Sequence, residues 1–155
     1  MHFPLRSTLT VAAFGLLVSA TPVLAESVAP VTGTGMFEAI LSGVAEVPPN
    51  EEAGTGMLEA TLDTDTNELI WSVIVEGLTG DPTAAHFHGP AEADENASPV
   101  LPVEGDLATS LGGSATLTDE QAADLEAGLW YFNIHTEQYP DGELRGQVLV
   151  YLGEV

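Results

Sequence analysis

The sequence contains no cysteine and no lysine, and its only two basic side chains are Arg6 and Arg145. Without cysteine there is no disulfide framework, no thiol nucleophile and no lipid-modified leader. Without lysine there is no Gly-x-x-x-x-Gly-Lys phosphate loop, and no serine lies in a Gly-x-Ser-x-Gly motif. These absences exclude the common templates for nucleotide binding and nucleophilic catalysis.

Acidic side chains dominate the charge of the chain. There are 24 of them, and the formal net charge is −22. Such a charge repels nucleic acids and anionic membrane surfaces, so neither is expected as a partner. Self-repulsion of this size is relieved by salt. We therefore predict a marine or halophilic source and a fold that needs salt.

Residues 1–25 have the features of a secretory signal peptide. Arg6 supplies the positive charge, residues 9–18 form an apolar run, and Val23-Leu24-Ala25 is a small-residue cleavage site. The apolar run is short for a bilayer span, although an uncleaved N-terminal anchor is the alternative. We expect cleavage before Glu26, a secreted or periplasmic protein, and no transmembrane segment after cleavage. The remaining chain holds one arginine against 24 carboxylates, a net charge of −23.

After the leader, residues 26–35 are expected to form a linker and residues 36–152 a single domain. Short alternating or β-branched runs bounded by turn residues are typical of strands. They occur at residues 36–42, 56–63, 68–77, around 84–88, and at 98–103, 113–118, 129–136 and 143–151. Thr118 and Gln121 form a capping-box pattern that opens a helix at residues 119–126, with Gly128 as its C-terminal stop. The pattern predicts an all-β fold, an antiparallel Greek-key β-sandwich or barrel, with one short helix.

Three histidines fall in two of these strands. His86 and His88 are spaced so that both point to one face of a strand, and His135 lies in the run Trp130–Thr136. If the strands are neighbours, three imidazoles converge on a site suited to copper or zinc, with an open fourth position. The alternative is that the histidines serve packing and hydrogen bonding. The acidic loop at residues 63–68 is a weaker alternative, for calcium, because it lacks the EF-hand spacing.

Five further residues are candidates for contacts behind the ligands. Glu46, Asp141 and Glu143 could each accept the second N–H of a ligand histidine, although a solvated carboxylate is the better expectation for any one of them. Tyr131 lies four residues before His135, so on a strand both side chains point to the same face, and Tyr131 could form an aromatic wall beside the metal. Arg145 is expected to clamp the last strand to a loop such as residues 46–50, rather than guide a small anion to the metal.

Read together, the motifs resemble the CHRD domain, first described in chordin. The resemblance runs from about Met36 to Val150. Its motifs are Leu41-Ser42-Gly43, Glu46-Val47-Pro48-Pro49, Gly54-Thr55-Gly56, Ala60-Thr61-Leu62-Asp63, Leu69-Ile70-Trp71, Gly77-Leu78-Thr79-Gly80, Ala84-Ala85-His86-Phe87-His88-Gly89-Pro90-Ala91, Leu129-Trp130-Tyr131-Phe132-Asn133-Ile134-His135-Thr136, Tyr139-Pro140-Asp141-Gly142-Glu143 and Arg145-Gly146-Gln147.

The resemblance implies an immunoglobulin-like or barrel-like β-structure and an exported protein. Chordin itself is a secreted antagonist of growth factors, but its cysteine-rich modules are missing here, so that activity is not carried over. A weaker likeness is to copper-zinc superoxide dismutases, which share a His-x-His strand and a late strand like Gly142–Gly146. Those enzymes use more histidines than this chain retains, and they carry a disulfide.

The sequence therefore predicts an exported CHRD-domain protein that binds copper or zinc through His86, His88 and His135. A binding role is favoured over an enzyme. Two alternatives stay open at this point. One is a structural module that binds another extracellular protein without metal, and the other is a copper-dependent enzyme similar to superoxide dismutase.

Overall fold

The computed structural model describes residues 33–153. The predicted signal peptide (residues 1–25) and most of the predicted linker lie outside this range. Within it the chain forms eight strands, a 3-10 turn and one short helix. The elements are β1 (Thr34–Ser42), η1 (Gly43–Ala45), β2 (Thr55–Asp63), β3 (Glu68–Glu76), β4 (Pro82–His88), β5 (Pro99–Pro102), β6 (Gly113–Thr116), α1 (Asp119–Glu126), β7 (Trp130–Thr136) and β8 (Leu144–Val150).

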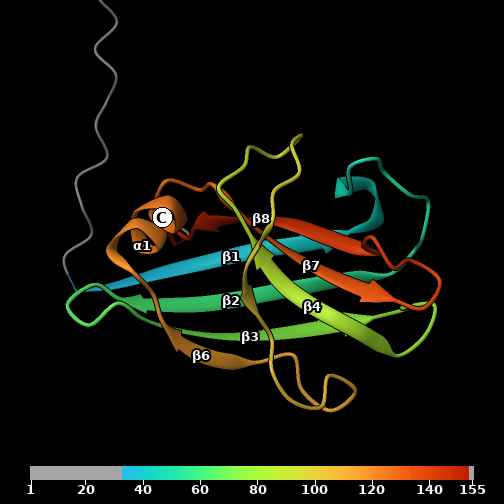
Figure 1. Cartoon of the computed structure of the whole chain (residues 1–155), viewed down its shortest axis with the longest axis horizontal. Helices are drawn as coiled ribbons and strands as arrows, with labels where there is room; N and C mark the ends of the chain where they lie inside the picture. Colours follow the sequence, from blue (N-terminus) through green and yellow to red (C-terminus); the bar gives the residue numbers. More distant parts are fainter. Residues whose placement is uncertain (1–32, 154–155) are drawn as a thin grey trace, which may run out of the picture.

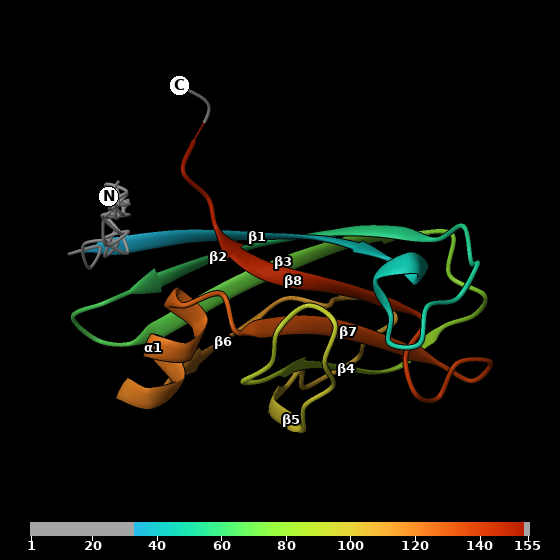
Figure 2. The same ribbon diagram turned by 90° about the horizontal axis from the view of Figure 1, so that it is seen from above.

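All strand pairs are antiparallel and belong to one sheet, in the order β5-β4-β7-β8-β1-β2-β3-β6. The predicted all-β fold with one helix is confirmed. The sheet curls into a half-barrel, with β1, β2 and β3 on one side and β4, β5 and β7 on the other (Figures 1 and 2). The curl brings Trp71 of β3 against Phe87 of β4, with ring centroids 5.2 Å apart, although four strands separate β3 from β4 in the sheet.

The hairpin β2–β3 shows how local chemistry fixes the register. Thr55 pairs with Glu76 at one end and Asp63 with Glu68 at the other. A carboxylate oxygen of Asp63 accepts hydrogen bonds from the backbone N–H groups of Asp65 and Thr66, which satisfies donors that the turn would otherwise leave free. Register matters here because a slip by one residue would send every core side chain to the solvent.

The first strand starts earlier than expected. Thr34 and Gly35 extend β1 by two residues because they pair with Asp63 and Leu62 of β2. Tertiary pairing rather than local pattern decides this boundary.

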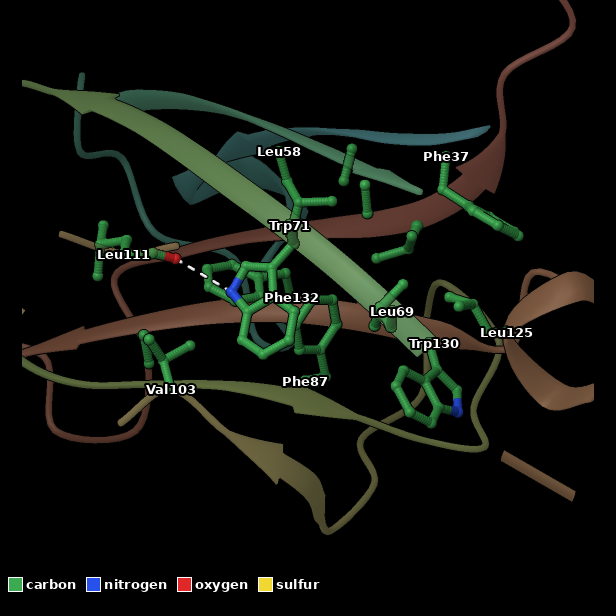
Figure 3. Packing of buried hydrophobic residues seen from close by; sticks show 14 of the residues in the cluster. Phe37, Leu58, Leu69, Trp71, Phe87, Val103, Leu111, Leu125, Trp130 and Phe132 are labelled. Carbon is green, nitrogen blue, oxygen red and sulfur yellow. Dashed lines mark hydrogen bonds between the residues drawn. The ribbon is translucent and has the colours of Figure 1, made fainter. Parts of the chain in front are cut away.

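The core fills the inside of the curl (Figure 3). Phe87 packs against Phe132 with ring centroids 4.9 Å apart and also contacts Trp71 and Trp130. The indole N–H of Trp71 donates to the carbonyl of Leu111 at 3.1 Å, so its polar atom is satisfied inside the core. Each such buried aromatic contributes about 2–3 kcal/mol of transfer free energy.

Helix α1 closes one end of the half-barrel. Its capping box is confirmed, because the Thr118 hydroxyl accepts from the Gln121 N–H and the Gln121 side chain accepts from the Thr118 N–H. Gly128 has a positive φ of 73°, as a C-terminal stop requires. Leu125 is buried against the core, which ties the helix to the sheet. Within residues 33–153, no helix is long and apolar enough to cross a bilayer.

Strand β7 is buried over its whole length. Trp130, Phe132 and Ile134 point into the core, and the alternating residues Tyr131 and His135 lie on the outer face. An outer face of an antiparallel sheet is usually solvated. Here loops cover it, and the space beneath them contains the candidate site.

Candidate metal centre

Neighbouring strands bring the three histidines together. His86 and His88 project from β4 to the outer face, while Phe87 between them is in the core. His135 projects from β7, the strand paired with β4, and it lies diagonally across from His86. One ring nitrogen from each histidine lies within 4.8 Å of the others, a group that could hold a metal ion.

Two of the rings are oriented by backbone carbonyls. His88 Nδ1 lies 2.9 Å from the carbonyl oxygen of Ala97, and His135 Nδ1 lies 2.9 Å from that of Pro140. A carbonyl oxygen can only accept, so Nδ1 carries the proton in each ring. The Nε2 atoms of His88 and His135 are therefore left with lone pairs, the state that a metal ligand needs.

One pair of nitrogens in the cluster has the spacing of two ligands on one metal. His86 Nδ1 and His135 Nε2 are 3.2 Å apart. Two ligand nitrogens of a tetrahedral zinc, each about 2.0–2.1 Å from the metal, would be about 3.3 Å apart. Without a metal, the same distance suits a hydrogen bond from His86 to His135, so this pair alone does not decide between the two states.

His88 bears on the choice between the two states. Its Nε2 is buried and has no hydrogen-bond partner. A buried polar atom without a partner costs about 1–3 kcal/mol, and such atoms are rare in folded proteins. A metal ion bound to the lone pair would remove this cost.

The pKa values of all three histidines are lowered from the usual 6.5. Burial is the main cause in each ring, because it disfavours the charged form. His86 and His135 also repel each other's charge, which lowers the pKa of His86 further. The hydrogen bonds to Ala97 and Pro140 act in the opposite direction on their rings but do not reverse the shift. The cluster is thus neutral at neutral pH and competent to bind a metal.

Tyr131 forms the aromatic wall of the site. Its ring is stacked on that of His88, with centroids 4.7 Å apart and planes 6° apart. The guanidinium carbon of Arg145 lies 3.5 Å from the centre of the same ring. Because β7 runs between β4 and β8, His88 and Arg145 cover opposite faces of Tyr131. The three side chains form one stack that fixes the plane of the His88 ring.

Arg145 is a clamp, as expected, but to a different loop. Its guanidinium donates to the carbonyl oxygen of Glu95 at 2.6 Å and to the side-chain oxygen of Asn96 at 2.9 Å. The expected loop at residues 46–50 is not the one it binds. Since the carbonyl of Ala97 follows directly, the clamp also positions the group that orients His88.

Glu46 is buried, so the expectation of a solvated carboxylate is wrong for this residue. Its side chain accepts a hydrogen bond from the amide of Asn133 at 2.5 Å. Burial raises its pKa from 4.5 to about 7, against the opposing effects of the Asn133 hydrogen bond and the nearby charge of Arg145. Gly142 makes room for the pair, because a Cβ there would lie 2.6 Å from the Asn133 amide nitrogen.

Glu46 and His88 line the same cavity, of about 360 Å³, together with Tyr131, Asn133 and Asp141. Asp141 is exposed in the turn after β7, and its negative charge acts to raise the pKa of His135. Among the three candidate carboxylates, Asp141 is thus the one that faces solvent. A small molecule that enters this cavity would meet His88 and the protonatable carboxyl of Glu46.

Glu143 is buried but serves another part of the fold. Its carboxylate accepts hydrogen bonds from the backbone N–H of Thr79 and from the hydroxyls of Thr79 and Thr136. It therefore ties the turn before β4 to strand β7. The expectation of a solvated side chain is wrong here too, and none of these bonds reaches a histidine.

The groups that hold the histidine rings were missed by the sequence analysis, which proposed carboxylates for this role. The structure gives it to the carbonyls of Ala97 and Pro140. A backbone carbonyl leaves no trace in residue type, so no signal could have identified these two. Asn133 alternates with the core residues as Tyr131 and His135 do, so the sequence places it on the same face, but its hydrogen bond to Glu46 could not be predicted.

Comparisons with known proteins agree with the motif analysis. The CHRD domain family matches residues 37–148, which include β1 through most of β8 and all three histidines. No curated protein and no solved structure gives a match. The family match spans well over half of the chain, and the protein belongs to the CHRD domain family.

Proposed function

We propose that the protein binds a transition metal through His86, His88 and His135, with copper preferred and zinc second. The observation that carries this proposal is the buried, unpartnered Nε2 of His88 beside two other neutral imidazoles. Nitrogen ligands bind copper(II) more tightly than zinc, which sets the order of preference. The cavity beside His88 leaves room for a fourth ligand such as water.

We also propose that the protein acts outside the cytoplasm, which rests on the signal-peptide features of residues 1–25. In that setting a metal-binding role agrees with the acidic surface, because a negative field raises the local concentration of cations. The same field opposes a superoxide dismutase, whose substrate is an anion. Binding or carriage of the metal is therefore the favoured activity.

The test is a titration of the mature protein with copper(II) and with zinc, followed by calorimetry. Because 24 carboxylates bind metals weakly, the buffer contains millimolar calcium, which occupies oxygen ligands and leaves imidazoles free. We expect one tight site per chain, and nitrogen hyperfine coupling in the electron paramagnetic resonance spectrum of the copper form.

His88→Ala is the decisive variant, and His86→Ala and His135→Ala are expected to behave in the same way. Glu137→Gln is the matched control, since it removes an exposed negative charge two residues from His135 without touching a ligand. Binding that survives in His88→Ala would overturn the proposal, and so would binding abolished by calcium. In either case the histidines would serve packing, and a protein partner would become the leading alternative.

A further inference from the structure

The outer face of β1, β2 and β3 exposes apolar side chains in register. Ile40, Met57 and Ile74 lie side by side across the three strands and are 61%, 42% and 71% exposed. A second exposed apolar group lies four residues along the strands from the first. It consists of Met36 on β1 and Ile70 on β3, with Thr61 of β2 between them. The chain is otherwise strongly acidic, so two aligned apolar groups on one sheet face need a reason.

Two carboxylates lie between these apolar groups. Glu38 pairs directly with Glu59 across β1 and β2, and like charges in this position destabilise a sheet. Both line a groove of about 390 Å³ whose other walls include Met36, Ile70 and Tyr151. Arg145, the only lysine or arginine among residues 33–153, is buried elsewhere, so no basic side chain of the described chain neutralises the pair.

The charge pair excludes several occupants of this face. A second copy in face-to-face contact would bring four carboxylates together, and an anionic membrane would be repelled. A purely apolar partner would bury Glu38 and Glu59 without compensation, which is costly. A small cation in the groove would leave Ile40 and Ile74 uncovered, since about 13 Å of strand separates the two apolar groups.

We propose that the outer face of β1–β3 docks a partner polypeptide that presents a lysine or arginine flanked by apolar side chains. The basic group enters the groove between Glu38 and Glu59, and its apolar neighbours cover Ile40, Met57 and Ile74. This face lies across the core from the histidine cluster, which is on the outer face of β4 and β7 (Figure 2). Docking would leave the candidate metal centre open.

The experiment uses a synthetic nine-residue peptide of alternating leucine and lysine, with a leucine–glutamate peptide as the negative probe. Backbone amide chemical shifts of the ¹⁵N-labelled protein are followed during titration at about 0.15 M NaCl, where long-range attraction is screened. We expect shifts concentrated at Ile40, Met57 and Ile74, and no shifts with the acidic peptide.

Two double variants with the same net charge separate docking from general attraction. Glu38→Gln/Glu59→Gln should weaken binding about fivefold, the size expected for two exposed ion pairs, whereas Glu51→Gln/Glu104→Gln should leave it within about twofold. Equal weakening in both variants, or shifts spread over all carboxylates, would overturn the proposal. Self-association through Ile40 and Ile74, or binding to anionic vesicles, would overturn it as well by assigning the face to another occupant.

Discussion

His88 and Tyr131 lie face to face, with ring planes only 6° apart, at a point where β4 and β7 are directly paired. Tyr131 therefore contacts the candidate ligand His88 directly. Its hydroxyl also contacts the N–H and the carbonyl of Ala97, in the loop that orients the His88 ring. The geometry of His88 therefore depends on Tyr131 in two ways, through its ring and through its hydroxyl.

Tyr131→Ala is expected to lower metal affinity by about 10–100-fold, the usual effect of losing a group that orients a ligand. It should also destabilise the fold by about 3–5 kcal/mol, because Tyr131 is 3% exposed and its loss leaves a cavity. Tyr131→Phe keeps the stack but loses the hydroxyl's contacts with Ala97, so it should cost about 1 kcal/mol of stability and lower metal affinity less than Tyr131→Ala does. Calorimetric metal titration and chemical denaturation measure both effects. Equal affinities in the two variants would show that the stack does not orient His88.

Glu46 makes the stability of the metal-free protein depend on pH. Its pKa is about 7 in the folded state and 4.5 in the reference state, so the folded protein binds more protons between these values. The stabilisation from the neutral carboxyl is fully present below pH 4.5 and is lost as the pH rises through 7. We expect the loss to be about 2 kcal/mol, below the full value for such a shift, since the cavity is open to water.

Glu46→Gln isolates this effect because its amide does not titrate. Denaturant unfolding from pH 5 to 8, in the presence of a chelator, should show the free energy of unfolding of the wild type falling relative to that of the variant as the pH rises. The histidines contribute with the opposite sign in both proteins, since a lowered pKa costs stability as the pH falls below 6.5. Parallel curves for wild type and variant would contradict a buried, protonatable Glu46.

Glu143→Gln should destabilise the domain by about 2–3 kcal/mol. The carboxylate accepts from three donors of Thr79 and Thr136, and an amide can accept with only one of its two polar atoms. Metal affinity should change little, because these bonds do not reach the histidines. Glu137→Gln, on the exposed side of the same segment, is the control for a lost charge. A Glu143→Gln variant as stable as Glu137→Gln would show that the hydrogen bonds of Glu143 contribute nothing to the stability of the domain.

Salt is expected to stabilise the mature protein. With one arginine against 24 carboxylates, mutual repulsion lowers the melting temperature at low ionic strength. Raising NaCl from about 0.01 to 1 M shortens the Debye length from about 30 to 3 Å and should raise the melting temperature by several degrees. Differential scanning calorimetry across a NaCl series checks this, with an equal osmolality of sucrose as the control. A flat or falling curve would rule out the predicted halophilic character.

Local signals in the sequence predicted local structure well. The Thr118–Gln121 capping box and Gly128 gave the bounds of α1 as the structure has them, and the parity of His86 and His88 put both on one face. Contacts between distant segments were harder to predict. The burial of Glu46 and the choice of loop by Arg145 depend on how loops fold over the outer face of the sheet, and residue type does not encode this.

Strand β7 is covered on both faces, and this cover would slow the release of a bound metal. Amide protons of a strand sealed on both sides exchange with solvent only when the whole domain opens. The backbone of His135 is on this strand, so it stays in place until the same rare event. A metal held there would dissociate through the more exposed His86 first, and its lifetime would follow the local motion of β4 rather than of β7.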